Sequence, residues 1–290
     1  DWQKAIYHEA WTHNLSANVS NSGEKGTMML SLNYINQDGV QKESYYQRFS
    51  ARVNTTYNIS KHLTVGENLM VAKWQNRGFD TGSDSGIPYV AMRQHPAIPV
   101  MQDGKYADPQ AMIGSDIANP VQSLYNGRDN SNDSWRIFGN GYVDIKPIKD
   151  LTIRSNFGLD YSSDFIHHMT YTFISDNVSE KTPKTAVDQT NAMRWTWSNT
   201  ANYMVPLPED HTLTALAGIE LHRENYKWLK GTSEDFAIEN ELYMWPNAAT
   251  GTDRVEGANF GYALISYFGK LDYNWKDRLL ASFTIRRDGS

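Results

Sequence analysis

The sequence predicts an all-β fold, an antiparallel up-and-down transmembrane β-barrel of which about ten consecutive strands are present. One observation is the long alternation of apolar and polar residues, clearest in 151–161, where Leu, Ile, Phe and Tyr would face one way and Thr, Arg, Asn and Asp the other. A strand of about eleven residues can cross a bilayer at a tilt, whereas soluble sandwich strands average about 5–6. The other observation is that short and long connectors follow one another in turn.

The alternation gives the strands in order along the chain. We expect them at 12–20, 26–36, 44–58, 62–75, 134–146, 150–163, 192–205, 211–225, 259–274 and 278–287. The short connectors are 21–25, 60–61, 147–149, 206–210 and 275–277, the long ones are 76–133, 164–191 and 226–258, and 37–43 is intermediate. Because neighbouring strands run in opposite directions, the short turns should share one end, the periplasmic one, and the long loops the other.

The parity of the alternation assigns each strand residue to one of two faces. Apolar side chains such as those of Phe157, Ile219 and Phe283, with Ala217, should point to lipid. Polar residues of the opposite parity should line an aqueous lumen, among them Arg154, Asn156 and Arg286. Two residues break the rule, because Glu67 and Asn199 fall in the apolar parity of their strands. A bare carboxylate in lipid is costly, so Glu67 should lie near a rim, be paired, or mark a bulge.

Composition excludes several classes of protein. The 290 residues carry a net charge of -6 with no cluster of Lys and Arg, which argues against a nucleic-acid partner. The mean hydropathy of -0.61 and the lack of a long apolar run argue against a transmembrane helix. The absence of Cys removes disulfides and thiol chemistry. No linker divides the chain, so we expect one domain over 1–290, and neither end has the features of a natural terminus, so we expect an excised piece.

Three motifs resemble catalytic or metal sites and are better explained otherwise. In the run from His8 to His13 the second His comes one residue too late for a zinc-protease helix. Asp80 and Asp84 could form a loose Ca²⁺ loop, but a solvated turn rich in Gly and Ser fits better. His167 and His168 have no nucleophile nearby and are interpreted as the edge of an exposed loop. We therefore expect no enzyme activity, no metal site and no cofactor.

Many segments in the right order resemble the SusC/RagA-type TonB-dependent outer-membrane transporters of Bacteroidetes. The most specific is 266–278, Ser-Tyr-Phe-Gly-Lys-Leu-Asp-Tyr-Asn-Trp-Lys-Asp-Arg, which leads to Arg-Arg-Asp-Gly-Ser at 286–290. The first hairpin resembles the family at Gly-Thr-Met-Met-Leu-Ser-Leu-Asn-Tyr, 26–34, and a family loop at His-Pro-Ala-Ile-Pro-Val, 95–100. Further matching segments are 48–54, 63–69, 119–121, 151–161, 197–200 and 216–220.

This resemblance implies more than the residues show by themselves. Family members have an N-terminal extension, a plug domain and a TonB-contacting segment, all absent from this sequence, and a barrel of about 22 strands. Residues 1–290 would then be part of the C-terminal β-barrel domain, located in the cell outer membrane. The implied partners are a SusD-like surface lipoprotein, TonB acting through the missing segment, outer-membrane lipid, and an oligosaccharide or peptide as ligand.

The long connectors concentrate aromatic and hydrogen-bonding side chains, which suit the apolar faces and polar edges of saccharides and peptides. From 76–133 and 226–258 we select as candidate substrate-binding residues Arg93, Tyr106, Trp228, Tyr243 and Trp245.

Three functions from different classes remain open. The first is a wall segment of an energised outer-membrane nutrient importer, for glycans or peptides. The second is a soluble β-sandwich or β-helix carbohydrate-binding module, which should show short strands without alternating connector lengths. The third is an outer-membrane enzyme on a barrel scaffold, which should show a nucleophile with its base or paired carboxylates at the lumen mouth; the sequence offers neither.

Overall fold

A computed structural model describes residues 1–173 and 179–290, and one ten-stranded antiparallel sheet dominates it. The strands follow the order β1-β2-β3-β4-β7-β8-β9-β10-β11-β12, so every strand pairs with its neighbours along the chain except across the insertion between β4 and β7. Their bounds are β1 Thr12–Gly23, β2 Gly26–Asp38, β3 Tyr45–Ser60, β4 Leu63–Arg77, β7 Ser131–Ile145, β8 Leu151–Thr170, β9 Lys184–Val205, β10 His211–Glu234, β11 Asp253–Trp275 and β12 Leu279–Gly289. The predicted up-and-down barrel wall is confirmed.

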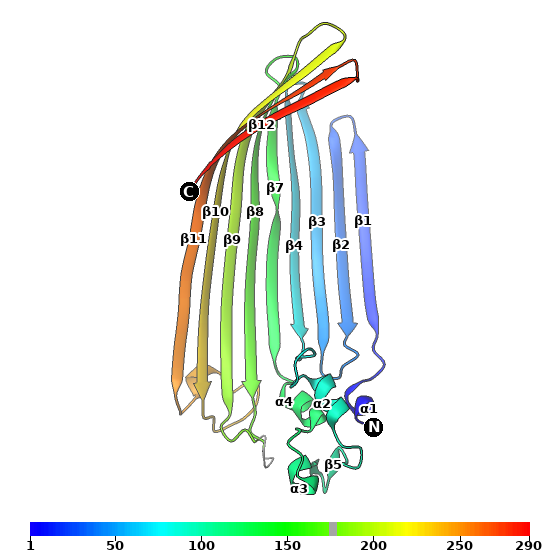
Figure 1. Ribbon diagram of the computed structural model, residues 1–290, viewed down its shortest axis with the longest axis vertical. Helices are drawn as coiled ribbons and strands as arrows, with labels where there is room; N and C mark the ends of the chain where they lie inside the picture. Colours follow the sequence, from blue (N-terminus) through cyan, green and yellow to red (C-terminus); the bar gives the residue numbers. More distant parts are fainter. Residues whose placement is uncertain (174–178) are drawn as a thin grey trace.

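The connectors divide between the two ends of the sheet as predicted. Short turns such as those after β1, β7 and β9 lie at the upper end in Figure 1. The long connectors 78–130 and 235–252, together with 39–44, lie at the lower end, which we call the loop end. The alternation of connector lengths therefore reports strand direction correctly.

The strands β8 to β11 are longer than the sequence predicts. The loops expected at 164–191 and 226–258 shrink to 171–183 and 235–252, because strand pairing continues toward the loop end. At about 3.3 Å per residue and a tilt of about 40°, the 24 residues of β10 rise roughly 60 Å, more than twice the apolar band of about 25 Å. The alternation of apolar and polar residues that marks the predicted strands therefore stops before the strand pairing does.

The strand register confirms the two predicted faces. Residues directly opposite in neighbouring strands share a face, and Phe157 lies opposite Trp197 while Asn156 lies opposite Ser198. The register runs without a shift through β7 to β12, and the shift that occurs in the sheet lies between Asn58 and Ser60 of β3, at the turn end. We call the face that carries Asn156 the inner face and the face that carries Phe157 the outer face.

The two residues that break the parity do lie on the outer face. Glu67 pairs with Thr55 and Gly141 in an unshifted register, and the Thr55 hydroxyl donates a hydrogen bond to its carboxylate. Of the three explanations considered for Glu67, pairing is the one that the structure supports, and a bulge is excluded. Asn199 also sits in continuous register, opposite Ser155 and Ile219.

A small folded unit, which we call the cap, occupies the insertion 78–130 at the loop end. It contains α2 (Ile87–Arg93), the hairpin of β5 (Met101–Gln102) and β6 (Lys105–Tyr106), α3 (Pro109–Ile113) and α4 (Pro120–Asn126). The N-terminal helix α1 (Trp2–Ile6) packs against it, and Figure 1 shows these helices below β1 to β4. Their shared apolar core is formed by Trp2, Ile6, Ile87, Ala91, Ile98, Ala107 and Leu124.

No helix in the described parts of the chain has the length and apolar character needed to cross a membrane. A 3₁₀ turn, η1 (Pro246–Ala248), lies in the connector 235–252.

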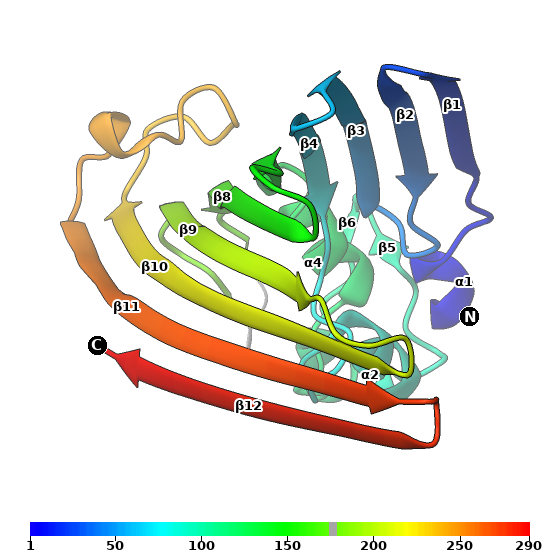
Figure 2. The ribbon, with the colours of Figure 1, turned by 90° about the horizontal axis from the view of Figure 1, so that it is seen from above.

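The sheet is curved, and among the described residues it is open between β1 and β12 (Figure 2). Every residue of these two edge strands is exposed. The other described sheet is the two-stranded hairpin of β5 and β6, so no second large sheet covers the first. A soluble sandwich would bury one face of each of two sheets against the other, and the described residues lack that arrangement.

The two faces should respond differently to charge. Phe157 lies about six residues from the start of β8, roughly 15 Å along the barrel axis and near the middle of the apolar band. In the membrane-embedded protein, Phe157→Asp replaces a lipid-facing ring by a carboxylate, at a cost on the order of 3 kcal/mol. We expect Phe157→Asp to abolish heat-modifiable outer-membrane protein on gels, and Asn156→Asp to leave most of it. Equal tolerance of the two substitutions would contradict the assignment of the faces.

The 290 residues expressed by themselves should not form a soluble monomer. Unpaired edge strands and an outer band of exposed Leu, Val, Ile, Phe and Tyr side chains favour association in water, and open edges are costly in lipid. We expect insoluble material, measured by sedimentation, size-exclusion chromatography and circular dichroism. A soluble monomer that melts cooperatively would refute this expectation and favour the carbohydrate-binding module.

Candidate functional site

The cap is built around one buried amide, Asn119. Its Oδ1 accepts from the backbone N–H groups of Val121 and Gln122 at 3.1 and 3.4 Å and so caps α4, and Pro120 begins the helix. Its Nδ2 donates to the carbonyls of Val100 and Ala107 at 2.9 and 3.2 Å. One side chain thus joins α4 to the two residues that flank the β5–β6 hairpin, Val100 before β5 and Ala107 after β6, next to Tyr106.

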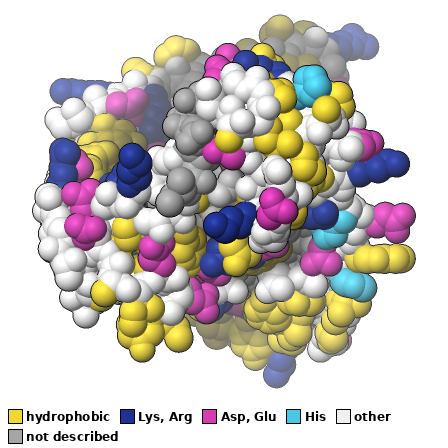
Figure 3. Space-filling view, turned by 90° about the horizontal axis from the view of Figure 1, so that it is seen from below, with side chains coloured by type: hydrophobic (Ala, Val, Ile, Leu, Met, Phe, Trp, Pro, Cys, Tyr) yellow, Lys and Arg dark blue, Asp and Glu magenta, His cyan; other side chains and the backbone are white. Residues whose placement is uncertain are grey.

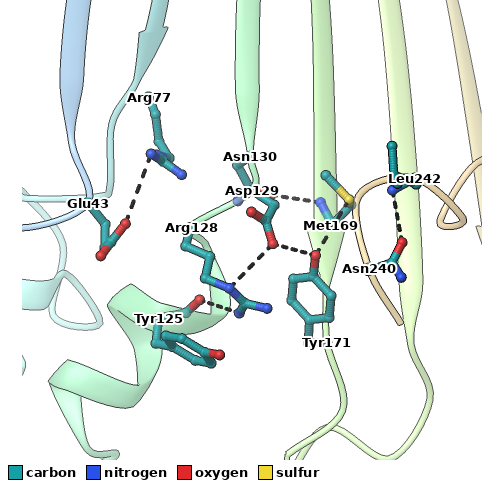
Figure 4. Close-up of polar contacts among 10 residues, drawn as sticks. All are labelled: Glu43, Arg77, Tyr125, Arg128, Asp129, Asn130, Met169, Tyr171, Asn240 and Leu242. Carbon is teal, nitrogen blue, oxygen red and sulfur yellow. Dashed lines mark hydrogen bonds and ion pairs between the residues drawn. The ribbon is translucent and has the colours of Figure 1, made fainter. Parts of the chain in front are cut away.

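A stacked cation joins the cap to the sheet just beyond α4. The Arg128 guanidinium lies over the rings of Tyr125 and Tyr171, with 3.9 and 4.5 Å to the ring centroids (Figure 4). Arg128 also donates to the Tyr125 carbonyl at 2.8 Å and pairs with Asp129 at 3.4 Å. The Tyr171 hydroxyl, just past the end of β8, donates to the Asp129 carboxylate at 2.6 Å. Burial, and next the hydrogen bond to Asp129, raise the pKa of Tyr171, so its phenol stays protonated.

Tyr106 extends this cluster toward solvent. Its ring centroid lies 5.8 Å from that of Tyr125, which is 46% exposed. We define the rim cluster as Tyr106, Tyr125, Arg128 and Tyr171. Two tyrosine rings beside a cation, at the edge of the loop end, offer an apolar face and hydrogen-bonding groups to a solute.

A second loop packs on the outer face of the β8 extension, and we call it the clasp, residues 235–252. The Trp245 ring lies 4.5 Å from the His167 ring and 6.2 Å from the Phe165 ring. His167 Nε2 lies 2.8 Å from the Thr185 hydroxyl and 3.1 Å from the Met244 carbonyl. The interpretation of His167 as an exposed loop edge is therefore wrong: the residue belongs to β8, is 4% exposed and holds the clasp.

The five predicted binding residues do not form one site. Arg93 ends α2, with its guanidinium 5.4 Å from the Tyr89 ring centroid, and Tyr106 belongs to the rim cluster. Trp228 lies in β10 on the inner face, not in a loop as expected, because the strand continues to Glu234. Tyr243 is exposed on the clasp, and Trp245 packs against the outer face. Their roles in binding stay predictions.

The inner face of the tall strands carries a row of paired charges. Arg136 donates two hydrogen bonds of 2.9 Å to Asp160, and Arg194 lies 3.8 Å from Asp160 and 3.0 Å from Glu224. Asp160, Arg194 and Glu224 lie directly opposite one another in β8, β9 and β10. Because opposite charges alternate along the row, it presents little net charge to a solute.

The inner face of β1 to β4 is different: it forms a cavity of about 570 Å³ lined by Arg48 and Arg52, and neither arginine has a carboxylate within ion-pair distance among residues 1–173 and 179–290. The parity of the alternation puts both arginines on the inner face, but parity by itself does not separate them from the other inner arginines. Strand register makes that distinction. Arg128 was missed altogether, since its partner Tyr171 lies 43 positions away.

The motifs that resembled metal sites lack the required geometry. His8 follows α1 and its Nε2 contacts the Gly39 carbonyl at 2.9 Å, while His13 is the second residue of β1. Asp80 accepts hydrogen bonds from Gly82 N and Ser83 N at 2.9 and 3.2 Å, and the Ser83 hydroxyl lowers the pKa of this carboxyl. Within 1–173 and 179–290 no three His, Cys, Asp or Glu side chains are placed to hold a metal ion. Asp80 therefore stabilises a turn.

The loop end presents charges of both signs without a dominant one. Figure 3, which looks onto this end, shows acidic and basic side chains interspersed, with apolar side chains exposed between them. The exposed apolar residues at this end include Tyr89, Met92, Ile113, Leu242 and Tyr243.

Comparison with known proteins relates the whole chain to outer-membrane receptors. The TonB-dependent receptor P26 of Formosa agariphila is 26% identical over 304 residues, which cover 100% of this chain and 29% of the relative. The TonB-dependent receptor SusC of Bacteroides thetaiotaomicron is 24% identical over 317 residues, covering 100% of this chain and 30% of the relative. No family model matches the sequence. The chain thus spans about 30% of the length of these curated relatives.

Solved structures share the fold. The RagAB peptide transporter superposes with a TM-score of 0.83 at 23% identity, over 99% of this chain and 33% of that chain. The RagAB peptide importer in its closed-closed state gives a TM-score of 0.82 at 24% identity, again over 99% and 33%. Together with the curated relatives, these structures confirm the SusC/RagA-type resemblance that the sequence predicts.

The clasp should loosen in acid. Burial lowers the pKa of His167, the Met244 carbonyl opposes this effect, and His168 adds to it. Since the packed histidine resists protonation, the clasp is fully stable above the ordinary pKa of about 6.5 and loses stability as the pH falls below it. Hydrogen exchange of 235–252, corrected for its intrinsic pH dependence, should rise between pH 7.5 and pH 5. In His167→Phe that rise should disappear; its persistence would exclude His167 as the titrating group.

Proposed function

Because the chain is of the SusC/RagA type, we propose that it forms part of the barrel wall of an energised outer-membrane importer for oligosaccharides or peptides. The observation that carries the proposal is the match of TonB-dependent receptors along the entire chain. The sheet supports it, since an apolar outer face and a polar inner face are what a lipid-embedded wall around an aqueous lumen requires.

In this proposal the loop end faces the cell exterior and the turn end the periplasm. A SusD-like lipoprotein would lie over the loop end, and TonB would supply energy through another segment of the transporter. The rim cluster and the inner face of the β8–β11 extension would meet the solute first. Of the predicted residues, Tyr106 and Trp228 lie on these two surfaces. Two positions from Trp228, the Tyr226 ring lies tilted against the Phe260 ring, with 4.9 Å between the ring centroids.

The import proposal is tested in a strain that lacks the whole transporter. Uptake of defined mixtures of oligosaccharides and of peptides is followed by mass spectrometry of the medium, with and without a protonophore that removes TonB-derived energy. We expect the deletion and the protonophore to stop depletion of the same members of one mixture. If the deletion strain removes oligosaccharides and peptides from the medium as fast as the parent strain, import by this transporter is contradicted.

The predicted binding role of Trp228 has a matched control one residue away. Trp228 lies on the inner face of β10, and Leu229 is exposed on the outer face. Loss of one aromatic stacking contact is worth about 0.5–1.5 kcal/mol, so Trp228→Ala in the full-length transporter should raise the KM of uptake roughly 2–13-fold. Leu229→Ala should leave the KM unchanged at equal protein level in the membrane. Equal KM values for the two variants would remove Trp228 from the binding surface.

A further inference from the structure

Two inner-face arginines differ from all the others. Five described arginines on the inner face have a carboxylate within ion-pair distance, namely Arg136, Arg154, Arg194, Arg254 and Arg286. Arg48 and Arg52 of β3 have none among residues 1–173 and 179–290: Arg48 Nη2 contacts Asn33 Oδ1 at 3.3 Å, and Arg52 Nη2 contacts Met70 Sδ at 3.6 Å. Their positive charges are therefore uncompensated where the rest of the wall is balanced.

The surroundings of these arginines are built for hydrogen bonding. The cavity of about 570 Å³ is lined by three arginines, Arg48, Arg52 and Arg136, and by no Asp or Glu, although the whole chain is acidic with a net charge of -6. Asn33 lines the cavity and is held in place, since its Nδ2 donates to Asn14 Oδ1 at 2.7 Å and to Ser16 Oγ at 2.9 Å. The Asn33 amide in turn holds the Arg48 side chain.

Arg48 also carries a buried donor that lacks an acceptor. Its Nε atom is buried and has no hydrogen-bond partner in the described structure. A buried unpaired donor is destabilising, and more so on a charged group, so such a group in a native wall calls for an acceptor from outside. The unsatisfied nitrogen and the absence of carboxylates both point to an anion.

The position of the cavity indicates that the anionic groups belong to an extended solute that enters from the loop end. Arg48 lies near the start of β3 at Tyr45, on the loop-end half of the wall, from which a solute would enter. Arg48 and Arg52 are four residues apart in the strand, about 13 Å between Cα atoms, which suits two charged groups carried along one extended molecule. Tyr46 and Trp74 line the same cavity and offer ring faces beside Arg48, since Trp74 lies opposite Arg48 and Tyr46 lies two positions away in β3.

We propose that the inner face of β2 to β4 binds the oxyanion groups, carboxylate or sulfate, of an acidic oligomeric solute through Arg48 and Arg52. The proposal rests on the proposed import function and specifies its substrate class. Guanidinium groups bind carboxylate and sulfate through paired N–H donors, and such charge-assisted bonds are stronger than neutral ones. An acidic peptide and an acidic oligosaccharide present the same chemistry to this site.

The experiment measures binding by calorimetry to the full-length transporter purified in detergent. One probe is an octapeptide that alternates glutamate and alanine, with its glutamine counterpart; the other is trigalacturonate, with neutral trigalactose. Variants are Arg48→Gln, Arg52→Gln and the double variant. The control is Arg223→Gln, which removes an exposed arginine from the outer face of β10.

We expect the double variant to weaken binding of an acidic probe about tenfold or more, and Arg223→Gln to leave it unchanged. Binding of the neutral probes should be unaffected, and added salt should weaken only the acidic ones. If the double variant loses binding of the glutamate peptide alone, a peptide is the source of the oxyanion. If it loses binding of trigalacturonate alone, the source is a glycan.

Other outcomes overturn the proposal. If the double variant binds acidic probes as well as the parent, the arginines are not an anion site for solutes. If instead it lowers the melting temperature and weakens acidic and neutral probes alike, the arginines pair with a carboxylate of the transporter itself. A failure of the import proposal can be told apart from a failure of the anion-binding proposal. A parent protein that transports neither oligosaccharides nor peptides can still bind the acidic probes in the calorimeter.

Discussion

Backbone pairing between neighbouring strands is the constraint on which the rest of this structure depends. In lipid no water is present to satisfy N–H and C=O groups, so each strand must lie beside a partner in register along its whole length. That requirement fixes the parity of every residue from β7 to β12, where no shift interrupts the ladders. It also accounts for Glu67, which parity forces onto the outer face and which is accommodated there by the Thr55 hydroxyl.

The sequence was informative where lipid imposes a pattern and silent where it does not. Residues near Phe157 alternate between an apolar outer face and a polar inner face, and that stretch was predicted correctly. Beyond Tyr161 the same strand continues to Thr170 with histidines and aspartate on it, and propensity alone could not tell this extension from a loop. The cap was missed for a related reason: its helices have five to seven residues, too few to show helical periodicity, and are held by tertiary contacts of Asn119 and Trp2.

For the candidate sites, too, some features could be predicted from the sequence and others could not. Sequence parity could place Arg48 and Arg136 on one face, but whether either has a carboxylate within reach depends on the exact register between neighbouring strands. Arg136 reaches Asp160, and Arg48 faces Trp74 across the ladder. Likewise Trp245 and His167 are 78 positions apart, and their contact arises because the clasp folds back over an extension that had not been predicted. Composition identified aromatic loops without showing which face each ring would cover.

The cap also bears on how the wall assembles. Between Arg77 and Ser131 the chain leaves one strand and must return beside it, and an unstructured excursion of that length would carry a large entropy of closure. Most of the cap core comes from residues close together in the sequence, so it can condense from local contacts before the two strands meet. Its two ends then emerge next to one another, with Arg128 and Asn130 already turned toward β8. Because the folded cap holds its two ends beside the paired strands β4 and β7, it shortens the effective loop that this pairing must close.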